Sequence, residues 1–262
     1  MMAVSLLGVS YLAGYSLAEG FIGTLYLCYD AINTFVYAEY ANERDIKIFS
    51  VAKKLGLLAQ MITILLVLLC VYCLLHISGL SQEANRAALT VIIGRSIGTL
   101  FFTMITPYYV YYRSEGKEKI ATISRLFTAA LNIILDVLAV VDHLGIVGVT
   151  SATVISEILE YVFLRSYSIL HKLKFAKSSW REAFGYIRLM LQGYGVQLSI
   201  QLNIIGVSMA VSRLGDTCYA MYGIINTISE QLMWFVYSND MIVEILYGEF
   251  KDKYNLDSSG DL

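Results

Sequence analysis

The sequence predicts an all-α, polytopic membrane protein with about seven transmembrane helices. Of its 262 residues, 57% are hydrophobic and only 15% are charged, and the mean hydropathy is +0.63. Two long runs contain no Asp, Glu, Lys or Arg, one between Lys54 and Glu83 and one between Arg188 and Arg213. Each run is longer than the roughly 20 residues that a helix needs to cross the hydrocarbon core of a bilayer. A lipid bilayer is therefore the expected surrounding.

Seven apolar segments follow one another along the chain, and each is long enough to span a membrane. They comprise residues 3–38, 54–77, 88–112, 119–141, 144–170, 187–212 and 217–248. The first segment is longer than one perpendicular span, so it is either strongly tilted or begins with residues of a preceding loop. Pro107, the only proline, is expected to bend the third segment.

The basic residues distinguish the two sides of the membrane. All but three of the 19 Lys and Arg lie near the C-terminus or in the connections after the first, third and fifth segments; the exceptions are Arg86, Arg95 and Arg213. The positive-inside rule places these connections and the C-terminus in the cytoplasm and the N-terminus of this chain outside. We expect a multi-pass protein of the cytoplasmic (plasma) membrane. An external N-terminus without a basic signal region favours a missing preceding helix.

An internal repeat supports this expectation. DAINTFVYAEY at residues 30–40 and DMIVEILYGEF at residues 240–250 share identical residues at four positions. The match equates the first and seventh segments and predicts two parallel six-helix lobes. On this scheme, residues 1–171 form N-lobe helices, 172–187 an amphipathic cytoplasmic linker, and 188–262 the first two helices of the C-lobe. One helix would precede residue 1, and four would follow residue 262.

Asn132 and Asp136 interrupt the apolar segment 119–141. Because they are four residues apart, both project from one face of a helix about one turn apart. An ionisable group inside the apolar layer is rare and is by default a functional-site hypothesis. Burial disfavours the charged carboxylate, which suits a group that takes up and releases protons, and Asn132 offers an amide donor or a carbonyl oxygen. The alternative is that Asp136 lies near the outer interface and is only solvated.

Other polar residues of the apolar segments are candidates for lining a central cavity; they are Glu230, Asp30, Asp240, Arg95, Gln197 and Gln201. Asp30 and Asp240 occupy equivalent repeat positions, where they either attract cationic substrates or are solvated near the membrane surface. Glu230 either faces the cavity or makes an interhelical hydrogen bond. No partner for Arg95 can be named from the sequence, and a surface pair of Glu160 with Arg165 stays open.

The stretch 131–156 resembles the multidrug and toxic compound extrusion (MATE) exporters. Asn132 and Asp136 match the N-x-x-x-D of the family's fifth helix, and residues 145–156 match the G-I-x-G-x-x-x-A-T-x-I-S that follows it. The polar stretches 40–56, 108–119 and 212–216 are similar to the family's connections after its second, fourth and seventh helices. The resemblance covers nearly all of the chain, as family helices two to eight of a partial two-lobe exporter fold.

The resemblance implies a secondary active efflux transporter that exchanges H+ or Na+ for amphipathic or cationic drugs or metabolites, without a further cofactor. Asp136 and Asn132 would couple cation or proton binding to transport. The chain departs from the family in two places. The first family helix, which supplies an acidic partner in many members, is absent. Four helices of the C-lobe are absent too. The missing helices of the same transporter are therefore an expected partner. The sixth segment has glutamines, among them Gln197 and Gln201, where some members carry a carboxylate.

Several alternatives stay open. A lipid-linked oligosaccharide flippase of the same superfamily would be favoured by a strongly cationic central cavity. A fragment that does not transport is a second alternative, and a seven-helix receptor is a third, although a receptor leaves the repeat unexplained. The sequence contains no His cluster, nucleophile motif or phosphate-binding glycine loop, so neither an enzyme nor a metal site is expected. A net charge of -2 gives no indication of nucleic-acid binding.

Overall fold

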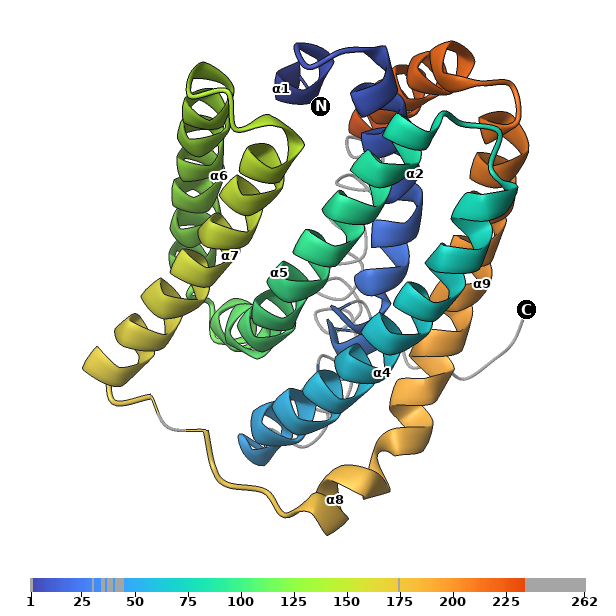
Figure 1. Cartoon of the computed structure of the whole chain (residues 1–262). Coiled ribbons are helices and arrows are strands. Elements are labelled where there is room, and N and C mark those ends of the chain that lie inside the picture. The colour runs from blue at the N-terminus through green and yellow to red at the C-terminus, as the bar shows by residue number, and fades with distance from the viewer. Residues whose placement is uncertain are drawn as a thin grey trace, which may run out of the picture. The chain divides into compact units, whose positions relative to one another are not determined.

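Every secondary-structure element in the described part of the chain is a helix, as the sequence predicts. The computed structural model describes residues 2–29, 31–33, 36, 40, 45–173 and 175–233. The chain divides into two compact units, Met1–Ala220 and Met221–Leu262. The helices of the first unit are α1 (Met2–Ser5), α2 (Val9–Leu25), α4 (Lys47–Ile77), α5 (Gln82–Ser114), α6 (Glu118–Val141), α7 (Gly145–Leu170), α8 (Trp180–Gly185) and α9 (Ile187–Ser212) (Figure 1). In the second unit, residues 221–233 are helical.

Among the described residues, five helices are long and apolar enough to cross a membrane: α4, α5, α6, α7 and α9. They correspond, within a few residues at each end, to the second through sixth predicted segments. Large apolar side chains point away from the protein on these helices; Leu69 of α4 and Ile133 of α6 are 61% and 64% exposed. A soluble protein rarely exposes apolar surface on this scale, whereas lipid solvates it. The protein is therefore a polytopic membrane protein.

The predicted segment 3–38 is divided in the structure. The short helix α1 ends at Ser5, and Gly8, with φ of 123°, separates it from α2. The first residues therefore do not extend the long helix. Of the seventh segment, residues 217–233 are described and helical. Asp30 and Asp240, the paired acidic residues of the repeat, lie outside the described residues.

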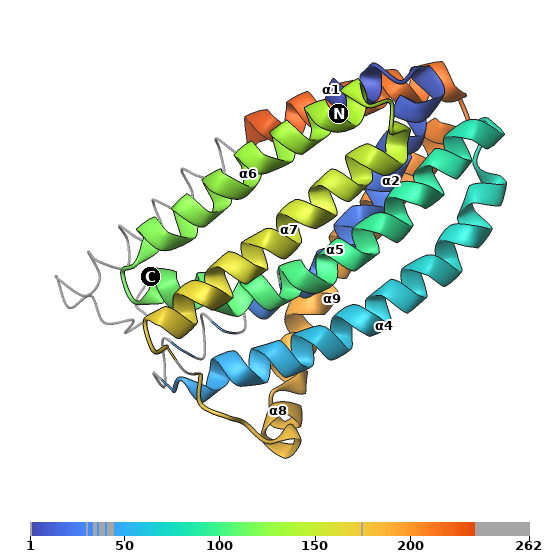
Figure 2. The same ribbon diagram turned by 60° about the vertical axis from the view of Figure 1, so that its left-hand side comes forward.

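α5 is the central helix of the first unit. It packs against α2, α4 and α7, while α6 packs on α7 and α9 packs on α2 (Figures 1 and 2). A fully buried amide joins α4 to α5, because Gln60 Nε2 donates to Thr99 Oγ1 at 3.0 Å and Thr103 Oγ1 donates to Gln60 Oε1 at 3.1 Å. Satisfying both ends of the amide removes the cost of placing it between apolar helices.

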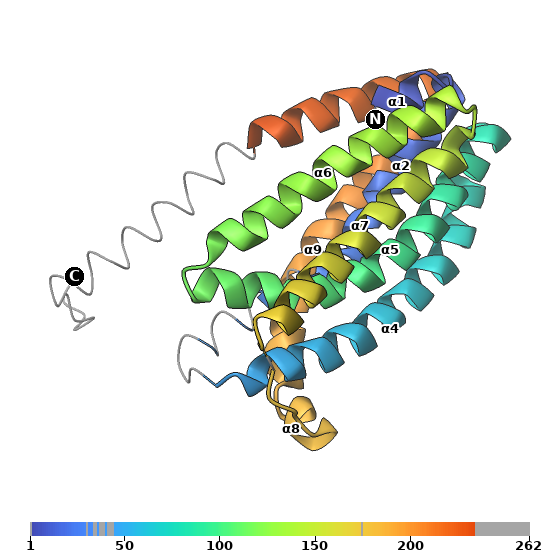
Figure 3. The same ribbon diagram turned by 90° about the vertical axis from the view of Figure 1, so that its left-hand side faces the viewer.

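The bend expected from Pro107 lies within a continuous helix. Pro107 is inside α5, and α5 changes direction towards its C-terminal end (Figure 3). Proline has no N–H to donate to the preceding turn and its ring crowds that turn, so a helix that contains it bends without ending. The bend turns the last part of α5 towards the start of α6.

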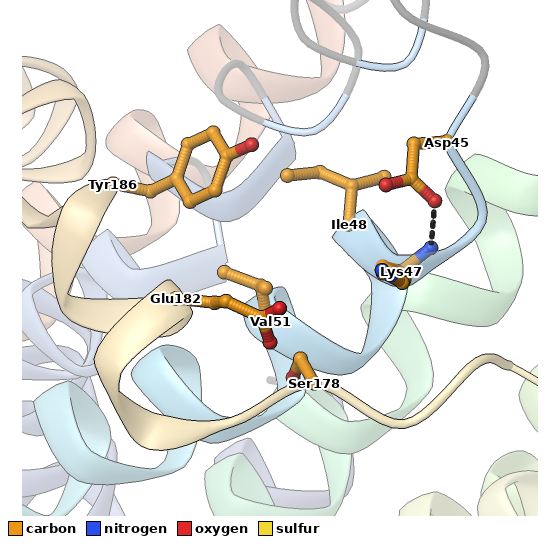
Figure 4. Close-up of a pocket in the computed structure, with 7 residues that line it drawn as sticks. All are labelled: Asp45, Lys47, Ile48, Val51, Ser178, Glu182 and Tyr186. Carbon is orange, nitrogen blue, oxygen red and sulfur yellow. Dashed lines mark hydrogen bonds between the residues drawn. The ribbon is translucent and has the colours of Figure 1, made fainter.

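The linker between α7 and α9 packs against the beginning of α4. A cavity of about 170 Å³ lies between them, lined by Asp45, Lys47, Ile48, Val51, Ser178, Glu182 and Tyr186 (Figure 4). Lys54 Nζ donates to the Ser178 carbonyl and lies 5.5 Å from the ring centroid of Trp180. These contacts tie the linker to α4 by a hydrogen bond and a cation–π interaction.

The short helix α8 has a well-defined start and an apolar surface. Ser179 and Glu182 form a capping box, and the hydrogen bonds from Ser179 lower the pKa of Glu182. Trp180 and Phe184, one turn apart, are 51% and 48% exposed. Exposed aromatic rings beside basic residues suit a segment that lies along a membrane surface, which is the role that the sequence predicts for 172–187.

The loop between α4 and α5 is tied to the loop after α9. Asp216 Oδ1 accepts the backbone N–H of Ser81 at 2.8 Å, and Asp216 Oδ2 accepts the Ser81 hydroxyl. The same Ser81 is the N-cap of α5, where its Oγ accepts the N–H of Ala84 at 3.2 Å. Burial opposes ionisation of Asp216, but the hydrogen bonds from Ser81, together with one from Ser10, outweigh it and lower the pKa of this carboxyl.

Replacing Asp216 by Asn should weaken this contact, since the amide loses the charge and one of two acceptor oxygens. We expect a loss of about 1 kcal/mol in the free energy of unfolding at neutral pH, measured by denaturant titration in detergent micelles. Because folding lowers the pKa, the carboxylate contributes fully to the free energy of unfolding at a pH above its pKa in the unfolded chain. This contribution is lost as the pH falls through its pKa in the folded protein. The difference between wild type and variant should therefore shrink below about pH 4.

The exposed Asp142 provides a charge-matched control at the end of another helix. Asp142→Asn should change stability little at either pH. A stability difference for Asp216→Asn that stays constant down to pH 2 would contradict the charged hydrogen bonds described for Asp216.

Candidate functional site

α6 has two chemically different faces. Small or hydroxyl side chains are buried on one face, at Ala121, Ser124, Thr128 and Ala139, and the partly buried Asn132 and Asp136 continue this stripe at helical spacing. The opposite face exposes large apolar side chains, at Ile133, Ile134, Val137, Leu138 and Val141. A soluble amphipathic helix buries its apolar face, so the reverse arrangement directs the polar stripe into the protein and the apolar face to lipid.

The predicted coupling pair lies on this polar stripe. Asn132 lines a cavity, whereas Asp136, one turn further along α6, is not among its lining residues. Within the part of the chain that the structure describes, Asn132 Nδ2 and Asp136 Oδ1 are buried atoms without a hydrogen-bond partner. Leaving such atoms unpaired costs free energy, and in native proteins such groups are explained by strain, by a functional role or by a bound water or ion.

The cavity lies between α5, α6 and α7, beside the end of α2, and has a volume of about 280 Å³. Its lining residues are Tyr26, Arg95, Arg125, Thr128, Ala129, Asn132, Thr153, Ser156 and Glu157. Most of these side chains can donate a hydrogen bond. Two of the residues from the sequence-predicted set, Asn132 and Arg95, are thus brought to the same cavity.

Glu157 of α7 is the partner of Arg95 that the sequence did not reveal. Arg95 Nη2 lies 3.7 Å from Glu157 Oε1, and the Tyr26 hydroxyl donates to the same oxygen at 3.0 Å. Arg95 also donates to the Tyr26 hydroxyl. The three side chains come from the end of α2, from α5 and from α7, so this small network fixes the mutual position of three elements.

A second ion pair lies further along α7. Arg125 Nη1 of α6 donates to Glu160 Oε2 at 3.1 Å, and the Tyr109 hydroxyl of α5 donates to Glu160 Oε1. The surface pair of Glu160 with Arg165 that the sequence left open is not formed, because Arg165 instead donates to the Tyr161 hydroxyl at 3.4 Å. Glu160 is fully buried, so its partners had to come from other helices.

Among the remaining sequence candidates, Gln197 and Gln201 do not line this cavity. Gln197 and Gln201 are on α9, both partly buried, and the Gln201 amide packs against Gly23 of α2. Glu230 belongs to the second unit, where it is exposed and accepts a hydrogen bond from Asn226 Nδ2 at 2.7 Å. The structure describes neither Asp30 nor Asp240.

No known family profile matches the sequence, and no curated protein matches it either. Solved structures do match. A multidrug resistance MATE family transporter of the MOP superfamily, in an inward-facing conformation, superposes with a TM-score of 0.66 at 21% identity, over 84% of this chain and 54% of that chain. The chain has the fold of a MATE transporter.

Two further structures support the MATE-type fold. The MATE multidrug transporter DinF-BH, in a ligand-bound complex, matches with a TM-score of 0.65 at 19% identity, over 86% of this chain and 53% of that chain. A MOP superfamily transporter from Pyrococcus furiosus, whose binding pocket is described as having reverse polarity, matches at 0.64 and 19% identity, over 87% and 54%. The chain thus spans about half the length of the transporters that it matches.

Gly98 of α5 makes room for the Glu157 carboxylate. A Cβ at Gly98 would collide with Glu157 Oε2, so any larger residue at this position would force the Glu157 carboxylate to move. Gly98→Ala should displace Glu157 from Arg95 and Tyr26 and destabilise the protein by about 1–3 kcal/mol. The measurement is the free energy of unfolding in detergent micelles or the melting temperature.

Gly206→Ala in α9 is the matched control, because a Cβ at Gly206 would meet no atom within 4 Å. This substitution should leave stability unchanged or raise it by up to about 1 kcal/mol, since alanine favours the helix. Equal stability of the Gly98→Ala and Gly206→Ala proteins would contradict the position assigned to Glu157.

Proposed function

We propose that this chain supplies the N-lobe and the beginning of the C-lobe of a secondary active efflux transporter. In this proposal the transporter lies in the plasma membrane, with the basic connections in the cytoplasm, and exchanges H+ or Na+ for amphipathic compounds. Asp136 takes up the coupling ion with Asn132 beside it, and the occupancy of this pair biases the packing of α5, α6 and α7 between two states.

One observation carries this proposal. The polar stripe of α6 faces the protein interior in a MATE-type fold, and it contains two buried polar atoms, on Asn132 and Asp136, that have no partner among the described residues. Glu160 differs, because a tyrosine and an arginine occupy its two oxygens. Glu157 has an arginine and a tyrosine at Oε1, while its Oε2 is unpaired among the described residues. Asp136 forms no ion pair among the described residues, and a carboxylate of this kind is the one whose state can change during a transport cycle.

Flipping of a lipid-linked oligosaccharide is the second candidate function. The sequence identified only Arg95 as a basic residue in the middle of a span, but Arg125 lines the same cavity. Two guanidinium groups suit the pyrophosphate of such a lipid, because the planar fork of arginine matches phosphate oxygens. This observation favours the flippase more strongly than the sequence alone does.

Asp136→Asn should abolish ion-driven transport in proteoliposomes of the full transporter, because the amide can neither take up a proton nor neutralise Na+. Uptake of rhodamine 6G and of pyrenebutyrate, one cationic and one anionic amphipathic dye, is measured under an imposed pH or Na+ gradient. We expect the gradient-dependent rate to fall at least tenfold, with membrane insertion unchanged. Asp142→Asn, which removes an exposed carboxylate near the same helix end, is the control and should transport normally. Normal gradient-driven uptake by Asp136→Asn would refute the coupling role.

A further inference from the structure

We propose that the cavity between α5, α6 and α7 holds an oxyanion group of the transported compound, a carboxylate or a phosphate. The proposal rests on the transport function above and names the chemistry of its substrate. Its basis is the orientation of the two ion pairs around the cavity. In both pairs the arginine lines the cavity and is the more exposed partner, whereas of the two glutamates only Glu157 reaches the lining.

The pair of Arg125 and Glu160 shows this orientation most clearly. The Glu160 side chain is 0% exposed and does not line the cavity, and its two oxygens accept from Tyr109 and Arg125. The Arg125 side chain is 53% exposed and lines the cavity. A ligand in the cavity therefore meets the guanidinium, while the carboxylate lies behind it with its acceptors in use.

The pair of Arg95 and Glu157 differs, because both of its side chains line the cavity. Glu157 Oε1 accepts from Tyr26 and faces Arg95, while Oε2 lies against Gly98 of α5. Arg95 Nε is a buried donor that has no partner in the described part of the chain. Arg95 therefore keeps an unused donor for a ligand. Glu157 Oε2 is also buried without a partner among the described residues, but it lies against Gly98.

Asn132 adds a donor from the same helix as Arg125, since its Nδ2 is unpaired among the described residues. The cavity thus combines unused donors on Arg95 and Asn132 with the exposed guanidinium of Arg125. Charge-assisted bonds from arginine forks are the strongest that a protein offers to carboxylate or phosphate oxygens, and they strengthen away from water. Two other carboxylates of this region, Glu19 and Asp136, are not among the lining residues, so the lining carries two guanidinium groups and one carboxylate.

The test is equilibrium binding to the full transporter in nanodiscs of neutral lipid, with no gradient imposed. Fluorescence anisotropy follows pyrenebutyrate, an amphipathic carboxylate, and in separate samples rhodamine 6G, an amphipathic cation. Farnesyl pyrophosphate is the competitor that represents a lipid-linked pyrophosphate. If farnesyl pyrophosphate displaces pyrenebutyrate, the site accepts lipid phosphates; if it does not, the site accepts soluble carboxylates. Either result upholds an oxyanion site and identifies its source.

Two variants change the cavity while limiting damage to the fold. Arg125→Gln with Glu160→Gln removes both charges of one pair, so that no lone carboxylate stays buried. Arg95→Lys keeps a cation opposite Glu157 but loses the planar fork. We expect the double variant to weaken pyrenebutyrate binding at least tenfold and Arg95→Lys to weaken it severalfold. Rhodamine 6G binding should not weaken in either.

Arg86→Gln is the matched control, because Arg86 lies on the same helix as Arg95 and does not line this cavity. It should bind pyrenebutyrate as the wild type does, and melting temperatures confirm that each variant is folded. Two results would overturn the proposal: folded cavity variants that bind pyrenebutyrate with unchanged affinity, or a wild type that binds rhodamine 6G and not pyrenebutyrate. Because binding needs no gradient, these outcomes are independent of whether Asp136→Asn still transports.

Discussion

Four charged side chains placed among apolar helices impose the main constraint on this structure. Moving an ion out of water costs several kcal/mol, and in lipid every polar group has to find its partner inside the protein. Arg95 and Arg125 meet this cost by pairing with Glu157 and Glu160, and each glutamate also accepts a tyrosine hydroxyl. Because the partners come from α5, α6, α7 and the end of α2, satisfying the charges determines how these four elements pack.

The central position of α5 follows from this constraint. α5 supplies Arg95 to one network and Tyr109 to the other, and it also holds α4 through Thr99 and Thr103 on the buried Gln60 amide. Gly98 allows the close approach of α7 that the first network needs. A helix in this position contributes few lipid-facing side chains. This explains why half of the residues in the most apolar stretch of α5 are buried, whereas only 17% are buried in the corresponding stretch of α6.

The spans and the polar stripe of α6 were predictable because both depend on local sequence: long uncharged runs indicate spanning helices, and a four-residue spacing places Asn132 and Asp136 on one face. The partners of Arg95 and Glu160 could not be predicted from the sequence, because ion pairs between helices depend on tertiary packing. Sequence spacing suggested Arg165 for Glu160, whereas Arg125 reaches it from α6. The sequence left open whether the first residues belong to the long helix or to a preceding loop, because the apolar pattern continues through Gly8, where the structure breaks the helix.

In the proposed transport cycle, the charge of the substrate decides how its binding is linked to the occupancy of Asp136. A cation and a proton compete for one carboxylate, so exchange follows directly from occupancy. An oxyanion held by Arg95 and Arg125 instead favours a neutralised Asp136 through simple Coulomb interaction, which couples the two ligands positively. Exchange of an anionic compound for H+ or Na+ then requires that Asp136 and the arginine cavity accept their ligands in different packings of α5, α6 and α7. The one-turn separation of Asp136 from Asn132 along α6 makes this possible, because a shift of α6 along α7 would move one towards the cavity as the other leaves it.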